Sequence, residues 1–557
     1  AERARDPDWF VRQRMLGYSA YVDRFGGTLD GVAARIDHLR SLGVDYLHLL
    51  PFLRARRGES DGGFAVASFD EIEPGLGNMD DLQSLAAKLR GASISLCADL
   101  VLNHVADEHP WATAALAGDP ALRSFFHIFP DRSQPDAYES ALGQVFPQTA
   151  PGNFTLVPGL GWTWTTFYPY QWDLNYTHPP VFTAMAHALL LLANRGVEVF
   201  RLDSAPFLWK RMGTACVNEP EVHLLLAALR ACTRLVAPGV LLKAEAIMPT
   251  TEVTRYFGRG KLSGRECQLA YHTGLMAAAW AGLAEGSAAL PRQILKETPA
   301  TPAGTGWITY VRCHDDIVWG VLREQVAAAG DDFGERIGAA AAFLEGRTPG
   351  SFARGAAFQA PALDTVHGSN GMTASLVGLP TDPFATPEPA ALRRFVLLHA
   401  LACWVGAVPV LYMGDELGQG NNDSPADAER VARDGRWLQR PALSRRAQQA
   451  LAAGKGVPSA TFAALQALAR TRRDPCWPAT EVPMVIDDPG SALLMVRRGG
   501  DALAVFNFGE LPIDLDLDVL DAGAGWSDRY ASGASAHDSP AATRRLEPWA
   551  VLWRMRD

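Results

Sequence analysis

Short apolar runs alternate with longer amphipathic segments through most of the chain. Eight of these runs have the length and the content of β-prone residues that are typical of buried strands. They cover residues 17–22, 44–50, 93–101, 197–202, 239–245, 267–271, 307–313 and 408–413. The segments between them, such as 29–43 and 180–196, space their apolar residues as helices do, and the first of these ends on a glycine suited to a helix C-cap. Eight strands that alternate with helices predict a parallel (β/α)8 TIM barrel of the α/β class.

The same pattern divides the chain into parts. The predicted barrel consists of residues 17–101, 179–316 and 381–475. Residues 102–178 and 317–380 are insertions after the third and seventh strands, each too long for an ordinary connection, and long loops on the carboxyl side of a barrel build its site. Residues 480–557 alternate apolar and polar positions without helical segments, which predicts a C-terminal antiparallel β domain of sandwich type. We expect residues 1–16 to be the remnant of an N-terminal helical segment.

Composition narrows the functional classes. The net charge of -10 argues against a nucleic-acid partner, because such proteins need a basic surface. Seven scattered cysteines without a C-x-x-C pair indicate free thiols in a reducing compartment, so we expect a cytoplasmic protein. No apolar run has the length of a membrane span, and we expect no membrane partner. Without a glycine-rich phosphate loop or a Schiff-base context, the sequence predicts no organic cofactor.

Charged residues end four of the predicted strands. The runs are D-L-V-L-N-H (99–104), R-L-D-S (201–204), K-A-E-A (243–246) and V-R-C-H-D-D (311–316). Because the carboxyl ends of barrel strands meet at one mouth, Asp203, Glu245 and Asp315 are expected to face one another there. A single such carboxylate is more simply explained as a cap or a salt-bridge partner. That explanation fits poorly when four strands all end in charged residues at the same barrel mouth.

This arrangement suits two carboxyl groups with opposite roles. A retaining glycosidase needs one ionised nucleophile and one protonated acid, and the acid later acts as the base that activates water. Arg201 precedes Asp203 by two residues and shares its side of the strand, so it is expected to keep that carboxylate ionised. The sequence therefore predicts glycoside cleavage at the barrel mouth.

At these residues the chain resembles the α-amylase family, glycoside hydrolase family 13, whose short motifs match D-L-V-L-N-H, R-L-D-S-A, E-A-I and H-D-D. Within that family it most resembles the amylosucrases and the related bacterial sucrose hydrolases. The strings that carry this resemblance include S-D-G-G-F-A-V (60–66), Q-W-D-L-N-Y (171–176) and Y-M-G-D-E (412–416). In this family the insertions 102–178 and 317–380 are called the B and B′ domains.

The resemblance implies a role for each matched position. Asp203 is the nucleophile, Glu245 the general acid/base, and Asp315 the stabiliser of the distorted transition state. The substrate-binding positions that it implies are Asp61, Phe64, His104, Phe167, Gln171, Arg201, His314, Asp316 and Arg436. Asp61 and Arg436 match an ion pair that closes the pocket behind one glucosyl unit. Some relatives bind calcium near Asn103, but no convincing further set of oxygen ligands is present, and we predict no required metal.

One departure from the amylosucrase pattern bears on the product. Gly143 stands where amylosucrases carry an arginine that holds the acceptor glucan. A weaker acceptor site lets water compete for the glucosyl-enzyme, so we predict a monomeric or homodimeric enzyme that hydrolyses sucrose. An amylosucrase that makes α-1,4-glucan and a catalytically inactive barrel that acts as a binding subunit remain as alternatives, since fold does not fix function. Arg336, Arg347 and Arg354 remain candidates to supply acceptor contacts instead.

Overall fold

The structure is a computed structural model that describes residues 8–11, 14–359, 367–474, 483–487, 490, 492–520, 522–523, 525–536 and 543–557. Of the predicted N-terminal segment, residues 8–11 form a turn and residues 14–16 are irregular, and the rest lies outside the described residues. The predicted start of the C-terminal domain at residue 480 also lies outside them.

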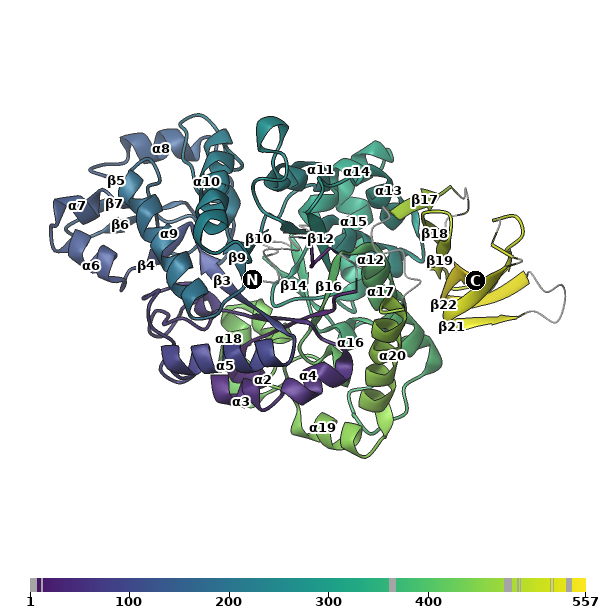
Figure 1. Ribbon diagram of the computed structural model, residues 1–557. Coiled ribbons are helices and arrows are strands. Elements are labelled where there is room, and N and C mark those ends of the chain that lie inside the picture. Colours follow the sequence, from purple (N-terminus) through teal and green to yellow (C-terminus); the bar gives the residue numbers. More distant parts are fainter. Residues whose placement is uncertain are drawn as a thin grey trace.

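Eight parallel strands form a closed barrel at the centre of the molecule (Figure 1). In order around the barrel they are β1 (Gly17–Ala20), β2 (Tyr46–Leu49), β3 (Ser95–Val101), β9 (Val199–Asp203), β10 (Leu241–Ala244), β11 (Leu269–Tyr271), β12 (Gly306–Tyr310) and β16 (Val408–Tyr412). All eight predicted strands are present, and β16 pairs with β1 to close the barrel. Nearly every strand residue is buried, because a parallel sheet is covered on both faces, and this is why the strands stand out as apolar runs. The predicted TIM barrel is confirmed.

Helices surround the barrel and connect its strands. They are α2 (Val22–Phe25), α3 (Leu29–Ala33), α4 (Ile36–Leu42), α5 (Met79–Gly91), α9 (Pro179–Asn194), α10 (Pro220–Val236), α11 (Thr250–Val253), α12 (Thr273–Glu285), α13 (Ala289–Glu297), α17 (Pro389–Val405), α18 (Ala428–Arg433), α19 (Arg445–Ala452) and α20 (Gly456–Arg472). The single helix expected over 29–43 is divided into α3 and α4, but it ends as predicted, with Gly43 at a left-handed φ of 85°.

Two insertions rise from the carboxyl ends of the strands. The first follows β3 and contains β4 (His104–Ala106), α6 (Pro110–Leu116), α7 (Pro120–Arg123), β5 (Ile128–Phe129), α8 (Ser133–Glu139), β6 (Phe154–Val157), β7 (Gly161–Trp164) and β8 (Gln171–Asp173). The second follows β12 and contains β13 (Ile317–Val318), α14 (Arg323–Ala328), α15 (Phe333–Leu344), β14 (Ala356–Phe358), β15 (Gly368–Asn370) and α16 (Thr373–Leu376). The first carries two small antiparallel sheets, β4–β8 and β5–β7–β6, and the second carries one, β13–β15–β14.

The C-terminal part differs from the predicted sandwich. Its strands are β17 (Pro483–Ile486), β18 (Leu493–Arg498), β19 (Ala502–Asn507), β20 (Ile513–Asp516), β21 (Trp526–Ala536) and β22 (Thr543–Arg556), and they form one antiparallel sheet. One face of this sheet joins the main core, where Trp553 packs on Trp404 of α17 with ring centroids 5.3 Å apart. The other face carries an apolar cluster of its own that includes Leu503, Trp526 and Leu552, and all the strands described in this part belong to the one sheet.

Candidate active site

A cavity of ≈ 260 Å³ opens at the carboxyl ends of the barrel strands, between the two insertions. Ten of the twelve predicted site residues line it: Asp61, Phe64, His104, Phe167, Arg201, Asp203, Glu245, Asp315, Asp316 and Arg436. Gln171 and His314 do not line this cavity. Gln171 is fully buried behind it, and His314 lines a smaller cavity that adjoins it.

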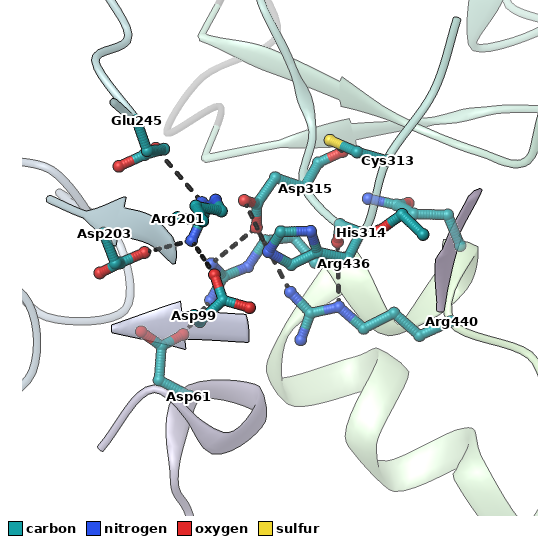
Figure 2. Close-up of polar contacts among 12 residues, drawn as sticks. Asp61, Asp99, Arg201, Asp203, Glu245, Cys313, His314, Asp315, Arg436 and Arg440 are labelled. Carbon is teal, nitrogen blue, oxygen red and sulfur yellow. Dashed lines mark hydrogen bonds and ion pairs between the residues drawn. The ribbon is translucent and has the colours of Figure 1, made fainter. Parts of the chain in front are cut away.

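Asp203 and Glu245 come from neighbouring strands. Asp203 is the last residue of β9, and Glu245 follows directly after β10, where its backbone N–H donates to Leu202 at 3.1 Å. Arg201 lies between the two carboxylates, with Nη1 2.6 Å from Asp203 Oδ1 and Nη2 3.6 Å from Glu245 Oε1 (Figure 2). The pairing of β9 with β10 therefore brings both predicted catalytic carboxyls to one guanidinium.

The backbone turns sharply after Asp203. Ser204 has φ 52°, a left-handed conformation that costs a non-glycine residue about 1–3 kcal/mol. In this conformation the Ser204 N–H donates to Glu245 Oε2 at 2.8 Å and its hydroxyl donates to Asp203 Oδ2 at 2.8 Å. The strained turn thus fixes both carboxyls at once.

The environment of Glu245 suits a proton donor. Burial, together with the negative charges of Asp203 and Asp315, outweighs the opposing effect of Arg201 and raises the pKa of Glu245 to about 7. Burial disfavours the charged form of Arg201, but Asp99, Glu245 and Asp203 outweigh that effect and hold the Arg201 pKa well above its usual range. Glu245, with a pKa near 7, can therefore act as an acid, while the permanently charged Arg201 favours the ionised form of Asp203 beside it.

Asp315 is surrounded by cationic and imidazole groups. His314 Nε2 lies 3.0 Å from one of its oxygens, and Arg436 and Arg440 lie 3.5 and 3.4 Å from the other. Burial alone would raise the pKa of Asp315, but these three groups hold it well below its usual range. The neighbouring Asp316 is buried beside this charge, and its pKa rises to about 7. The pKa values of the two adjacent aspartates are therefore shifted in opposite directions.

An ion pair closes the inner end of the cavity. Arg436 Nη2 lies 2.6 Å from Asp61 Oδ1, and both side chains are almost fully buried. The loop is shaped for this contact, since Asp61 has φ 54° and a Cβ at Gly62 would meet Arg440 Nη1 at 2.5 Å. Gln171 donates to Asp61 at 3.2 Å and its amide nitrogen lies 3.0 Å from His104 Nε2, so it supports the wall from behind. The pair expected from the resemblance is present.

Aromatic rings form the side walls. Phe64 stacks on His314 with centroids 5.3 Å apart, and the Arg201 guanidinium lies 5.4 Å from the Phe64 ring. Phe167 lies 5.0 Å from the ring of His104. Flat faces of this kind suit the apolar face of a sugar ring.

Several residues of the site were not predicted from the sequence. Asp99 binds Arg201 from below at 2.6 Å, and His48 lies 3.0 Å from the other oxygen of Asp99. Asp434 and Arg440, from the loop after β16, hold Arg436 and Asp315. Asp99 belongs to the motif D-L-V-L-N-H and was accessible to motif reasoning, but the others have no local signal. The outer walls of the cavity are largely apolar and are formed by Val145, Phe146, Phe207, Val217, Ile247, Val318 and Phe358.

An ammonium group lies beside Asn103, the position that the sequence resemblance associated with calcium. Lys210 Nζ lies 2.6 Å from Asp173 Oδ2 and 3.5 Å from Asn103 Oδ1, and it donates to the Phe207 carbonyl at 2.8 Å. Burial would raise the pKa of Asp173, but Lys210 and Thr166 lower it, so the two charges are paired. Lys210 therefore supplies a positive charge at this position and ties the first insertion to the barrel. Among the described residues, no group of three or more His, Cys, Asp or Glu side chains is placed to hold a metal ion.

The fold and these motifs define a class of protein. Residues 6–316 match the family model described as "Alpha amylase, catalytic domain", which covers more than half of the chain. The chain belongs to the α-amylase family, glycoside hydrolase family 13. No helix within the described ranges is long and apolar enough to cross a membrane.

Curated relatives share this region at moderate identity. The chain is 31% identical over 328 residues to trehalose synthase/amylase of Mycolicibacterium smegmatis, a match that covers 58% of this chain and 54% of that one. It is 29% identical over 430 residues to trehalose synthase of Pimelobacter, covering 75% and 68% of the two chains. It is 37% identical over 227 residues to glucosylglycerate phosphorylase of Allomeiothermus silvanus, covering 40% and 38%. The chain spans about half the length of the first of these relatives.

Solved structures share the architecture. Trehalulose synthase MutB from Pseudomonas mesoacidophila superposes with a TM-score of 0.68 at 17% identity, covering 98% of this chain and 99% of that one. Sucrose 6F-phosphate phosphorylase from Thermoanaerobacter thermosaccharolyticum superposes with a TM-score of 0.68 at 18% identity, covering 89% and 94%. At these identities the likeness establishes the fold alone.

Proposed function

We propose that the protein is a retaining glycoside hydrolase that cleaves sucrose into glucose and fructose through a covalent glucosyl-enzyme. The observation that carries this proposal is the Asp61–Arg436 ion pair at the inner end of the cavity. A cavity closed there admits the non-reducing glucosyl unit of a small glucoside and excludes attack within a long glucan. Two of the relatives, trehalose synthase and glucosylglycerate phosphorylase, are also named for small glucosides.

The first chemical step uses the two carboxyls held by Arg201. The Asp203 carboxylate attacks the anomeric carbon, and Glu245, whose pKa of about 7 keeps a large fraction of it protonated at neutral pH, gives its proton to the glycosidic oxygen as that bond breaks. Fructose then leaves and glucose remains esterified to Asp203. In the second step Glu245 takes a proton from water as the water oxygen bonds to the anomeric carbon, and the ester electrons return to Asp203.

Asp315 keeps its charge through both steps. Because His314, Arg436 and Arg440 hold its pKa low, it remains an acceptor for sugar hydroxyls. Such bonds strengthen as positive charge develops on the glucosyl ring, so they stabilise the transition state more than the bound substrate.

The pairing of the arginines in and near the cavity favours hydrolysis over glucan synthesis, because it leaves none of the described arginines there free to hold an acceptor glucan. Of the described residues that line it, Arg201 and Arg436 are the arginines, and both are paired with carboxylates. The other three arginines considered as acceptor contacts are engaged elsewhere: Arg336 binds Glu285, Arg347 binds Glu345, and Arg354 donates to the Leu379 carbonyl. An acceptor glucan would therefore lack charged donors here.

Glucosyl transfer is the second candidate. The apolar outer walls, with Phe146 and Phe207, would shield the glucosyl-enzyme from bulk water, and several relatives are named as synthases. A catalytically inactive barrel is disfavoured because the three carboxylates, Arg201 and His104 all line one cavity.

The deciding experiment incubates the purified protein with sucrose alone and follows glucose, fructose and oligosaccharides by chromatography. Equal glucose and fructose from the start support hydrolysis. Fructose in excess with accumulating glucan or a new disaccharide supports transfer. Asp203→Asn is the control, because it keeps the shape of the side chain and removes the nucleophile, and unchanged product formation by that variant would refute the mechanism.

A further inference from the structure

The walls of the catalytic cavity differ between its two ends. Charged side chains line the inner end, among them Asp61, Arg436 and Asp315. We call the outer side the apolar wall, and its residues are Val145, Phe146, Phe207, Val217, Ile247, Val318 and Phe358. Besides the charged groups and His104, the polar side chains among the described lining residues are Ser204, Asp316 and His367, and the Ser204 hydroxyl already donates to Asp203.

Two residues of the apolar wall keep much of their surface open to solvent. Val217 is 38% exposed and Ile247 is 43% exposed. Val217 comes from the segment between β9 and α10 and Ile247 from the segment after β10, yet both line the same cavity. Exposed apolar side chains that gather around a cavity mark a binding surface, because an apolar ligand would remove them from water.

The backbone on both sides of Val217 is left-handed. Cys216 has φ 51° and Asn218 has φ 60°, values that favour glycine. Local contacts hold this conformation, since Cys216 Sγ accepts from the Arg211 N–H at 3.2 Å and the Asn218 N–H donates to the Pro206 carbonyl at 2.8 Å. Backbone strain that the surroundings hold in place collects at functional sites. The loop therefore presents Val217 to the cavity as a fixed surface.

The same contacts join Val217 to the sugar pocket. Pro206, which binds the loop through its carbonyl, directly precedes Phe207. The Phe207 ring packs edge-on against Phe167 with centroids 5.4 Å apart, and Phe167 lies against His104. The apolar wall thus continues directly from the residues expected to hold the glucosyl ring.

This position is the one that a leaving group occupies. In a retaining enzyme the leaving group lies beside the carboxyl that protonates it, which in this chain is Glu245. Ile247 follows Glu245 by two residues, and both line the cavity. Hydroxyls turned toward an apolar surface lose their hydration without compensation, whereas an alkyl or aryl group gains by burial there.

We propose that the apolar wall is the leaving-group subsite and that it extends the activity to α-glucosides of apolar alcohols, with Val217 as a residue that determines specificity. This inference rests on the proposed retaining mechanism and names a class of leaving group besides fructose. Glu245 gives its proton to the glycosidic oxygen as the bond to the anomeric carbon breaks and Asp203 bonds to that carbon. Water then releases glucose from Asp203, so the products are glucose and the free alcohol.

The test compares ethyl, butyl and hexyl α-glucosides by the initial rate of glucose release. The three alcohols have nearly the same acidity, so the chemistry of departure is constant and only the buried apolar area changes. Full burial of a methylene would raise kcat/KM about fourfold. Because the wall covers one side of the alkyl chain, we expect about twofold per methylene, or about 16-fold from ethyl to hexyl.

Three variants locate the effect. Val217→Thr keeps the branched shape and adds a hydroxyl, so the gain from ethyl to hexyl should fall to about fourfold or less. Ile247→Thr makes the same change on another part of the wall and serves as a second test should Val217→Thr fold poorly. Met212→Thr is the matched control, because Met212 is 45% exposed on the same loop but is not among the residues that line the cavity, and it should keep the full gain.

Each outcome decides between the proposals. A flat or falling dependence on chain length in the unchanged protein overturns this inference, while sucrose turnover by the same preparation leaves the proposed function standing. A rise with chain length without sucrose turnover supports the apolar wall and refutes sucrose as the substrate. A full gain in folded Val217→Thr, or an equal loss in Met212→Thr, overturns the role of Val217. If neither sucrose nor any alkyl glucoside releases glucose, both proposals fail.

Discussion

Removing Arg436 tests how the closed end of the pocket works. This side chain is buried, binds Asp61 at 2.6 Å and Asp434 at 2.8 Å, and lies 3.5 Å from Asp315. Arg436→Met keeps much of its length and removes the charge. Burial already raises the pKa of Asp61, and Arg436 is the largest opposing influence, so the variant should raise that pKa further and favour the protonated form.

The magnitude follows from these contacts. Breaking a buried ion pair by removing one partner costs about 3–5 kcal/mol, because the other charge is left uncompensated. An ionised acceptor for a sugar hydroxyl is worth about 1.5–3 kcal/mol, so its loss should lower kcat/KM for sucrose by about 10- to 150-fold. We therefore expect a lower midpoint of thermal unfolding together with weaker turnover.

A double variant separates the two effects. In Arg436→Met with Asp61→Asn one of the two carboxylates that lose Arg436 is removed and Asp434 remains, so thermal stability should recover in part, whereas kcat/KM should stay low. Calorimetry and initial rates at low sucrose measure both quantities. If the single variant unfolds within a degree of the unchanged protein, or if the two substitutions destabilise additively, the two side chains are not energetically coupled and the reasoning fails.

Three further predictions concern other parts of the site. Because Glu245 must be protonated to release fructose and its pKa is raised to about 7, kcat/KM for sucrose should be level below that pH and fall about tenfold per pH unit above it, and a flat alkaline profile would exclude Glu245 as the acid. Lys210→Met should lower the unfolding temperature, because Asp173 loses its buried partner, whereas a chelator should leave the unchanged protein unaffected; a chelator-induced loss of stability would show that a metal is needed. Gly143→Arg should raise the oligosaccharide share of the products, since a Cβ there meets no atom within 4 Å, and an unchanged product ratio would show that this position does not hold an acceptor.

Much of the barrel could be predicted because each strand can be recognised from its own short stretch of sequence. A strand buried on both faces is apolar along most of its length, and each of the eight runs became a barrel strand. The C-terminal region was harder to predict, because alternation shows that a strand has two different faces but not what covers each of them. In this chain α17 covers one face, and the strands described in this region form a single sheet.

The carboxylates of the site were predictable for the same reason, since Asp203 and Glu245 stand at the ends of recognisable strands. The residues that hold these carboxylates and close the pocket were not predictable in this way. Asp61 and Arg436 are 375 positions apart, and Arg440 reaches Asp315 across 125. The resemblance proposed the first of these pairs, but no periodicity or spacing could do so.

The sequence by itself determined the barrel, the mouth at which its charged strand ends meet, and the kind of chemistry that two carboxyls and an arginine perform. Only the tertiary structure decided the raised pKa of Glu245, the closure of the pocket and the placement of Lys210 beside Asn103. The physical reason is that strand formation depends on neighbouring residues, whereas a pKa, an ion pair or a cavity depends on which distant side chains the closed barrel brings within a few ångströms and shields from water.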